Sequence, residues 1–417
     1  MTSDADTLRA ELRARLPDPL PNRLGVAVSG GSDSTALLRL LADIAQQEQI
    51  ELFAATVDHG LRSGSASEAL TVAALAQHWG IPHETLKWQG WDRKGNLQDQ
   101  ARRARYRLLA KWAESSALQA IALGHTADDQ AETVLMRLGR AAGVSGLSAM
   151  SGMRAESGIT LLRPLLAVTR SRLRNYLTAQ GISWIDDPSN QDQRFDRIKA
   201  RQALSGLDQI GITPQTLARV AENMGQAREA LAQYTQESAL RHLKGLDGDL
   251  CVDREGFGTL SEEIQRRLVV ASVSWIAGGE YPPRHKAVGQ VLDALSSAQT
   301  ATLGGCIFIP DCKNTWICRE LNAVSDEIAQ PGIPWDRRWI VTGPKTEDAE
   351  IRALGEDGLL QLENWRSAGK PRAALLSTPA VWTGDLVVAA PVAGFANQWR
   401  AEMLLERSDF AAVILSH

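Results

Sequence analysis

The sequence predicts an α/β fold with a doubly wound, mostly parallel sheet, followed by a small helical domain and a β-rich C-terminal domain. Short apolar runs alternate with helical patterns over the first two hundred residues, which is typical of a parallel sheet covered by helices. Polar stretches directly follow several of these runs, and ligands of such sheets bind at the carboxyl ends of the strands. We therefore expect domains at residues 1–205, 206–300 and 301–417.

The first half contains four expected strands, each followed by an expected helix. The strands are LGVAV (24–28), LFAATV (52–57), HETLKW (83–88) and LQAIAL (118–123). Apolar residues at helical spacing predict helices at 34–47, 66–79, 97–114 and 127–139. The stretches 29–34, 58–62 and 124–132 each follow a strand, so the spacing alone brings them to one edge of the sheet.

The second half changes from a helical to a strand-like pattern near residue 300. A long helix is expected at 213–243, with amphipathic helices at 261–277 and 284–296. The run TLGGCIFIPDCKNTWICREL then predicts a hairpin, and IPWDRRWIVTG and LVVAAPV predict short strands. We expect the tryptophans of this region to build a β-rich core, with a base-stacking platform as the alternative. They are Trp316, Trp335, Trp339, Trp365, Trp382 and Trp399.

The composition is that of an ordinary folded protein, with 44% hydrophobic and 23% charged residues. No apolar run approaches the roughly 20 residues of a membrane span, and the N-terminal stretch lacks a secretory signal pattern. We therefore expect a cytoplasmic protein without a membrane partner. The four cysteines form no C-x-x-C pair, which favours buried reduced thiols over zinc or iron–sulfur sites.

The net charge of −4 conceals three basic clusters in the first half of the chain. They lie within residues 93–111, 163–174 and 194–201. One such cluster alone indicates a solvated helix face. Three clusters near a phosphate-binding loop favour a polyanionic partner.

The stretch after the first strand has the composition of an anion-binding loop. Its residues are Ser29, Gly30, Gly31, Ser32, Asp33 and Ser34. Glycines let the backbone approach a phosphate, and the amides of the following helix favour negative charge. The lysine of the G-x-x-x-x-G-K-[ST] loop is absent, so transfer of the γ-phosphate is not indicated. Asp33 fits an anion site when Mg²⁺ bridges it to phosphates; the alternative is a turn and helix cap.

This loop and four later stretches resemble a known family. S-G-G-x-D-S is similar to the pyrophosphate loop of the N-type ATP pyrophosphatases (the PP-loop, adenine nucleotide alpha hydrolase-like fold), which transfer AMP from ATP to an oxygen. In order and spacing, the other stretches resemble the tRNA(Ile)-lysidine synthetase family within that group. They are VDHGLR (57–62), ARRARY (101–106), GHTADDQAET (124–133) and DDPSN (186–190).

The resemblance implies a two-step reaction. The family uses ATP and Mg²⁺ to adenylate O2 of the wobble cytidine in the CAU anticodon of an isoleucine tRNA, and free lysine then displaces AMP to form lysidine. It also implies that the C-terminal domains orient the tRNA. Members of the family are commonly homodimers, but the sequence itself does not give the oligomeric state.

The resemblance further implies a role for each matching residue. It assigns ATP binding to Ser29, Gly30, Gly31, Ser32, Asp33 and Ser34, with Mg²⁺ on Asp33. It assigns catalysis to Asp33, Arg105, His125 and Asp129. It assigns lysine binding to Asp129 and Glu132. It assigns tRNA binding to Arg194, Arg197 and Arg201.

Several alternatives stay open. Thr126-x-x-Asp129 is also a capping-box pattern, and the proton acceptor for lysine is His125, Asp58 or solvent. Ile198 stands where several relatives carry Asn, which puts the contact of that segment in doubt. A PP-loop tRNA thiolation enzyme shares the fold, but it would need cysteines and none precedes Cys251. A non-catalytic RNA-binding protein would release no pyrophosphate.

Overall fold

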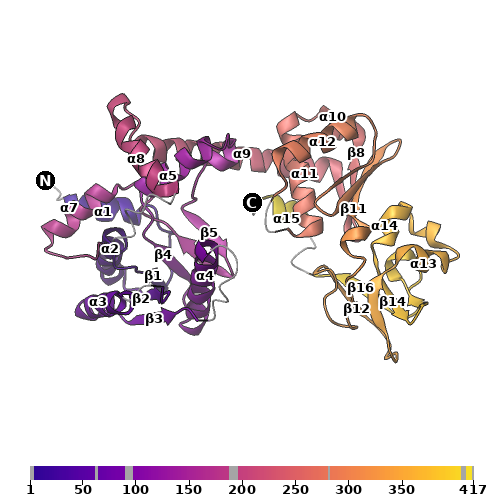
Figure 1. Cartoon of the computed structure of the whole chain (residues 1–417), viewed down its shortest axis with the longest axis horizontal. Coiled ribbons are helices and arrows are strands. Elements are labelled where there is room, and N and C mark those ends of the chain that lie inside the picture. The colour runs from indigo at the N-terminus through magenta and orange to yellow at the C-terminus, as the bar shows by residue number, and fades with distance from the viewer. Residues whose placement is uncertain are drawn as a thin grey trace. The chain divides into compact units, whose positions relative to one another are not determined.

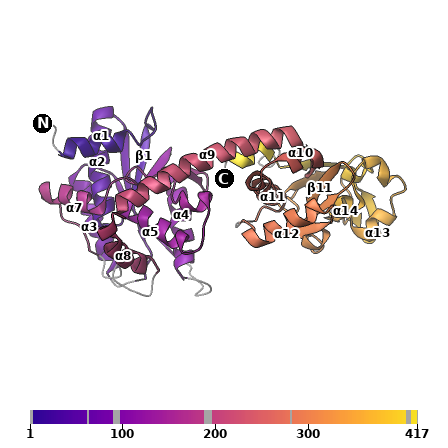
Figure 2. The ribbon, with the colours of Figure 1, turned by 90° about the horizontal axis from the view of Figure 1, so that it is seen from above.

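The computed structural model describes residues 4–61, 64–89, 97–186, 196–279, 282–404 and 410–415. The chain divides into two compact units, residues 1–228 and 229–417, drawn in indigo to magenta and in red to yellow in Figure 1. The boundary falls inside α9 (Pro214–His242), which Figure 2 shows as one continuous helix and which matches the long helix expected at 213–243. In these ranges, no helix is both long and apolar enough to cross a membrane.

The first unit is built around a six-stranded sheet with the order β3-β2-β1-β4-β6-β5. All neighbouring strands are parallel except β5, which pairs antiparallel with β6 at one edge. The strand order reverses direction between β1 and β4, as in a doubly wound fold. The predicted fold class is thus confirmed for this unit. The strands are β1 (Arg23–Ala27), β2 (Glu51–Asp58), β3 (His83–Lys87), β4 (Ala120–Leu123), β5 (Met153–Glu156) and β6 (Ile159–Leu162).

Helices cover both faces of this sheet, as Figure 1 shows for α2 and α4. One face packs against α1 (Asp4–Arg13), α2 (Ser32–Glu48), α3 (Ser65–His78) and α7 (Arg170–Ala179). The other face packs against α4 (Leu97–Ser115). The unit also contains α5 (Ala127–Leu138), α6 (Val144–Leu147), α8 (Asp196–Leu207) and the 3₁₀ turn η2 (Asp208–Ile210).

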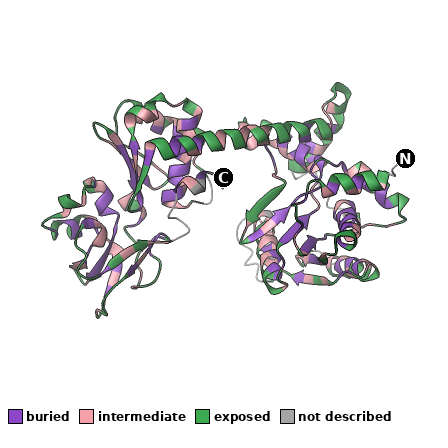
Figure 3. Ribbon diagram, turned by 180° about the vertical axis from the view of Figure 1, so that it is seen from behind, coloured by how far each residue is buried: buried purple, intermediate pink, exposed green. Residues whose placement is uncertain are grey.

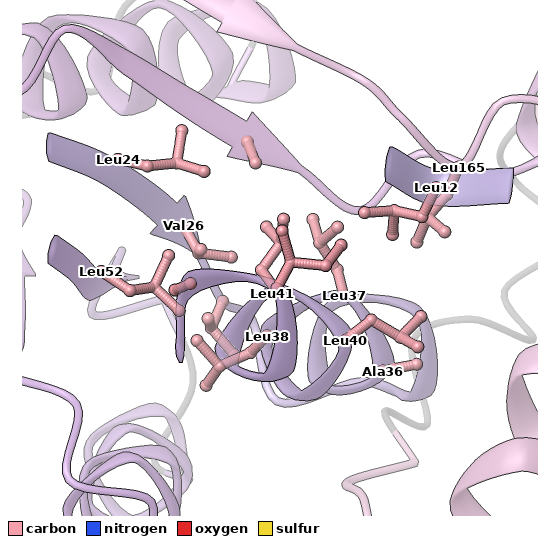
Figure 4. Close-up of a cluster of buried hydrophobic side chains, with 14 of the residues drawn as sticks. Leu12, Leu24, Val26, Ala36, Leu37, Leu38, Leu40, Leu41, Leu52 and Leu165 are labelled. Atoms are coloured by element: carbon pink, nitrogen blue, oxygen red, sulfur yellow. The ribbon is translucent and has the colours of Figure 1, made fainter. Parts of the chain in front are cut away.

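The two faces are set by alternation along the strands, because successive strand side chains point to opposite sides. Leu24 and Val26 of β1 pack toward α2 (Figure 4), whereas Ala27 belongs to the core beneath α4. Between them, a Cβ on Gly25 would lie 2.8 Å from the ring of Trp112. Glycine at this position therefore lets α4 approach the sheet. Figure 3 shows β1 and β4 buried and α9 largely exposed.

The second unit contains a five-stranded sheet with the order β7-β8-β11-β10-β9 and two smaller sheets, β12-β16 and β13-β14-β15. The hairpin predicted after residue 300 is confirmed, since β10 and β11 pair antiparallel. The strands of the first sheet are β7 (Leu243–Leu246), β8 (Asp249–Asp253), β9 (Ala301–Leu303), β10 (Cys306–Pro310) and β11 (Asn314–Arg319). Those of the smaller sheets are β12 (Trp339–Thr342), β13 (Glu350–Ala353), β14 (Pro379–Thr383), β15 (Leu386–Ala389) and β16 (Arg400–Met403).

Besides the last part of α9, this unit contains two longer helices, α11 and α12, and several short ones. They are α10 (Arg254–Thr259), α11 (Glu262–Ala277), α12 (His285–Ser296), α13 (Gly355–Leu360), α14 (Arg372–Leu376) and α15 (Phe410–Leu415). Three 3₁₀ turns accompany them, η3 (Leu321–Ala323), η4 (Trp365–Ala368) and η5 (Pro391–Ala393). Trp335, Trp339 and Trp399 share one hydrophobic cluster, so the predicted core is confirmed for these three. Trp382 belongs to a second cluster, against which Trp365 packs, and Trp316 belongs to a third.

Three features of the second unit differ from expectation. The boundary expected at residue 300 falls within one hydrophobic core, because α11 and α12 pack on a sheet whose strands come from both sides of that residue. Strands β7 and β8 were not expected there. Cys306 and Cys318 are buried free thiols, but Cys312 is exposed and Cys251 half-buried, so the expectation of buried thiols was wrong for these two.

Candidate active site

The loops that follow β1, β4 and β6 contact one another at the carboxyl edge of the first sheet. The amide of Ala127 donates to the carbonyl of Val168 at 2.9 Å. A Cβ on Gly124 would lie 2.9 Å from Cα of Ser34, so the turn after β4 lies directly against the start of α2. Glycine at 124 is what permits this approach. The site therefore forms at the reversal of strand order between β1 and β4, where doubly wound folds bind ligands.

The loop 29–34 leaves the first amides of α2 available to a ligand. Gly30 has a φ of +86°, a conformation that favours glycine. Ser34 shapes the loop, since its hydroxyl accepts from the Ser29 amide and donates to the Gly31 carbonyl, both at 3.1 Å. Among the residues that the structure describes, no side chain caps the helix at Gly31. The helix-cap alternative is therefore wrong, and the unbonded amides favour an anion.

Asp33 is held by two donors at the edge of this loop. Its Oδ2 accepts from Nε of Arg170 at 2.8 Å, and its Oδ1 accepts from the Ser32 hydroxyl at 3.0 Å. Burial raises the pKa of Asp33, while the adjacent Arg170 guanidinium opposes that rise. The carboxylate is thus stabilised by a neighbouring cation and would be stabilised further by a second one.

Asp129 caps a helix and also presents an oxygen to the site. Its Oδ2 accepts from the amide and the hydroxyl of Thr126, at 2.9 and 3.0 Å, so the capping-box interpretation is confirmed. Its Oδ1 lies 3.6 Å from Nη2 of Arg170, too far for a hydrogen bond. Burial alone would raise the pKa of Asp129, but Arg170 and the Thr126 amide lower it below its usual value. The capping role and an open carboxylate oxygen therefore coexist.

Glu132 lies one turn further along α5 and is almost fully buried, with its side chain 1% exposed. Its Oε1 accepts from Nε and Nη2 of Arg201, both at 2.8 Å. Its Oε2 is buried and has no hydrogen-bond partner among the residues that the structure describes. Burial raises the pKa of Glu132 and Arg201 counteracts it. A buried acceptor without a donor is costly, which indicates a position for a cationic ligand.

His125 experiences the charges of three arginine side chains. Its Nδ1 is buried and unpaired within the described part of the chain. Burial lowers the pKa of His125 well below its usual range, and charges on Arg105, Arg163 and Arg197 lower it further, although Asp129 opposes them. Three predicted catalytic residues therefore interact electrostatically, since the charges of Arg105 and Asp129 both act on His125.

Neither predicted proton acceptor is a strong base. A hydrogen bond from the Ser65 hydroxyl and another from the Gly60 amide lower the pKa of Asp58. His125, as described, is kept neutral by burial and by cations. Both groups therefore hold a proton less firmly than the same side chains in water, and solvent stays an alternative acceptor.

The expected tRNA-binding residues are only partly described. Arg194 lies outside the described residues, and so do Arg62 and residues 187–190 of the motifs at 57–62 and 186–190. Arg197 is exposed on α8, which packs along α5 (Figures 1 and 2). Arg201, on the same helix, is bound to Glu132 while its side chain stays 41% exposed. The structure therefore joins a residue expected to contact RNA to one expected to bind lysine.

Three arginines of the site were not predicted as site residues. Arg163 follows β6, is buried and donates from Nη1 to the Ser151 carbonyl at 3.0 Å. Arg170 and Arg174 lie one turn apart on α7 and reach Asp33 and Ser32, respectively. All three belong to a basic stretch of the sequence, but no local sequence pattern predicted that this stretch contacts the loop at 29–34.

Comparison with known proteins agrees with this geometry. Residues 5–207 match the PP-loop domain family, so the first unit is that of an ATP-utilising PP-loop protein. The chain is 53% identical over 418 residues to the tRNA(Ile)-lysidine synthase of Ruegeria pomeroyi, with both chains covered completely. It is 35% identical over 332 residues to the protein of the same name from Wolbachia pipientis wMel, with 77% of each chain covered. The chain belongs to the tRNA(Ile)-lysidine synthase family of ATP-dependent ligases, which confirms the resemblance drawn from its motifs.

Proposed function

We propose that this chain converts the wobble cytidine of a CAU-anticodon isoleucine tRNA to lysidine, using ATP and free lysine. One observation carries the proposal. Oε2 of Glu132 is buried without a hydrogen-bond partner among the described residues, and Oδ1 of Asp129 lies 3.6 Å from Nη2 of Arg170, which itself bonds Asp33 of the phosphate loop. An ammonium site next to an anion site is what a reaction between ATP and an amino acid needs.

The first step is transfer of AMP to the base. O2 of cytidine forms a bond to the α-phosphorus, the bond from that phosphorus to the bridging oxygen breaks, and pyrophosphate leaves with the electron pair. The open amides at the start of α2 stabilise the charge that develops on the leaving group. We assign Arg105, whose charge acts on both His59 and His125, to the phosphate of the adenylate.

The residues at the loop fit a magnesium ion. Mg²⁺ commonly takes one or two protein carboxylates and completes its shell with phosphate oxygens and waters. Asp33 supplies one such carboxylate; burial raises its pKa, and a nearby cation opposes that rise, as Arg170 already does. No group of three or more potential metal ligands occurs in the described ranges, which fits an ion held mainly by the nucleotide. When bound, the ion neutralises phosphate charge.

The second step joins lysine to the base. A neutral ε-amine attacks C2, the bond from C2 to O2 breaks, and AMP leaves with that oxygen and the electron pair. Lysine carries two ammonium groups, so the α-ammonium can stay charged beside Asp129 and Glu132 while the ε-ammonium loses its proton. The two carboxylates lie three residues apart and therefore share one face of α5.

Recognition of tRNA is assigned to the basic surface and to the second unit. The anticodon loop must present an unstacked cytidine, as RNA-modifying enzymes generally require. Arg194, Arg197 and Arg201 are proposed to contact the tRNA near the site, and the second unit, residues 229–417, to orient its acceptor arm. A thiolation enzyme is disfavoured because none of the four cysteines precedes Cys251.

The test is a reconstituted reaction. The chain is incubated with CAU-anticodon isoleucine tRNA, ATP, Mg²⁺ and lysine, and the digested nucleosides are analysed by mass spectrometry. We expect lysidine in place of one cytidine, and its absence with folded protein would refute the proposal. We also expect Asp33→Ala to abolish pyrophosphate release, because the substitution removes the carboxylate at the phosphate loop.

A further inference from the structure

Arg170 connects the helices that carry the two halves of the site. It is the first residue of α7, and its backbone amide donates to Oδ2 of Asp128 at 2.8 Å. Its Nε donates to Oδ2 of Asp33 at 2.8 Å, and its Nη2 lies 3.6 Å from Oδ1 of Asp129. The guanidinium is therefore fixed between the start of α2 and the start of α5.

This guanidinium keeps most of its hydrogen-bonding capacity free. The side chain is only 19% exposed, yet in the described part of the structure its one hydrogen bond comes from Nε. The N–H groups on Nη1 and Nη2 are left for another acceptor. Burial works against the charged form, but Asp33 and Asp129 raise the pKa of Arg170 above its usual value. The guanidinium of Arg170 is therefore a charged group fixed by its ion pairs, with Nη donors available to a ligand.

The unused donors lie beside the phosphate loop. Asp33, to which Arg170 is bonded, is the second residue of α2, whose first amides have no side-chain cap from the described parts of the chain. Arg174, one turn along α7, donates from Nε to the Ser32 hydroxyl at 3.3 Å. Two cations from one helix face thus reach two consecutive residues of the loop. A planar guanidinium matches the geometry of phosphate oxygens and can bond two of them at once.

We propose that Arg170 binds the pyrophosphate that leaves ATP, and that Asp33 and Asp129 hold its guanidinium in place for this. The proposal rests on the proposed function for the reaction in which pyrophosphate forms. As the bond from the α-phosphorus to the bridging oxygen breaks, the electron pair moves to that oxygen, and the Nη donors of Arg170 stabilise it. Binding of pyrophosphate itself requires neither tRNA nor lysine.

The opposing interpretation is a purely structural ion pair between α7 and α2. Arg170→Lys distinguishes the structural interpretation from pyrophosphate binding, because an ammonium keeps the positive charge but lacks the planar pair of N–H donors of a guanidinium. If the ion pair is purely structural, the Arg170 variants should have a changed melting temperature and an unchanged affinity for pyrophosphate. If Arg170 binds pyrophosphate, the affinity for pyrophosphate should be weaker in both Arg170→Lys and Arg170→Gln.

Titration calorimetry of the full chain with inorganic pyrophosphate, in buffer with Mg²⁺, tests the proposal. Loss of a charge-assisted contact predicts that Arg170→Gln weakens binding about 10-fold to 100-fold, and that Arg170→Lys weakens it by a smaller factor. Arg172→Gln is the matched control, because Arg172 lies on the same helix but bonds Asp4 and Glu11 of α1. Wild-type affinity in both Arg170 variants would overturn the proposal.

A second measurement uses the unmodified chain and does not depend on how the variants fold. Phenylglyoxal labels accessible arginines, and peptide mass spectrometry reports each position. Saturating pyrophosphate is expected to protect Arg170 and to leave Arg172 unchanged; equal labelling of Arg170 with and without pyrophosphate would contradict the assignment. Neither assay contains tRNA or lysine, so failure to form lysidine and failure of this proposal are separate results.

Discussion

Replacing Glu132 with glutamine changes one atom of the carboxylate site and preserves its shape. The amide oxygen can still accept from Arg201, as Oε1 of Glu132 does at 2.8 Å. The amide nitrogen then takes the place of Oε2, the buried oxygen without a partner in the described residues. A lysine ammonium arriving there would meet N–H donors instead of a charged acceptor. Binding of lysine should weaken, while the phosphate loop is untouched.

The magnitude follows from the burial of this carboxylate. The Glu132 side chain is 1% exposed, so salt and water screen its interaction with an ammonium very little. A hydrogen bond to a charged group contributes about 1.5–3 kcal/mol. At about 1.4 kcal/mol for each factor of ten, Glu132→Gln should raise the KM for lysine about 10-fold to 100-fold.

The assay measures lysidine formation against lysine concentration at saturating ATP and tRNA, and pyrophosphate release in parallel. We expect the lysine KM to rise and pyrophosphate release to stay near wild type. Glu114→Gln is the matched control, since Glu114 is exposed on α4. An unchanged lysine KM, or equal loss of both activities, would refute a lysine-binding role for Glu132.

The remaining predictions concern stability and loop packing. Burial raises the pKa of Glu132 in the folded state, so ionising this carboxyl group lowers the free energy of unfolding. The loss develops as the pH rises from the pKa of the unfolded chain through that of the folded one. Glu132→Gln should therefore melt above wild type at pH 7.5, with the difference vanishing below about pH 4; a lower melting temperature at pH 7.5 would contradict this. Gly124→Ala places a Cβ 2.9 Å from Ser34 Cα and should slow pyrophosphate release about 100-fold, whereas Gly206→Ala, with nothing within 4 Å, should not. Trp112→Ala should destabilise the first unit by about 3–5 kcal/mol in urea unfolding, and a loss under 1 kcal/mol would contradict the packing described for α4.

The strands predicted from the sequence are those that the sheet buries. Runs such as 24–28 and 118–123 are almost wholly apolar because both faces of a parallel strand are covered. The hairpin of β5 and β6 was not predicted, since β5 lies at the sheet edge and Met153 is 60% exposed. An edge strand with one solvated face carries little of the apolar pattern that marks a strand.

The site was predictable where its residues are neighbours in sequence. The loop at 29–34 and the start of α5 each carry their pattern within ten residues. Arg170 lies 137 residues from Asp33, and the pair of Glu132 with Arg201 spans 69 residues. Such contacts depend on how α7 and α8 pack against the sheet, which periodicity and spacing do not specify.

The central claim, adenylation of cytidine O2 followed by displacement with lysine, is tested most directly by following that oxygen. A CAU-anticodon isoleucine tRNA carrying ¹⁸O at O2 of the wobble cytidine is incubated with the chain, ATP, Mg²⁺ and lysine. The mechanism predicts that AMP carries the ¹⁸O and that lysidine does not. AMP without ¹⁸O, released while lysidine forms, would contradict it.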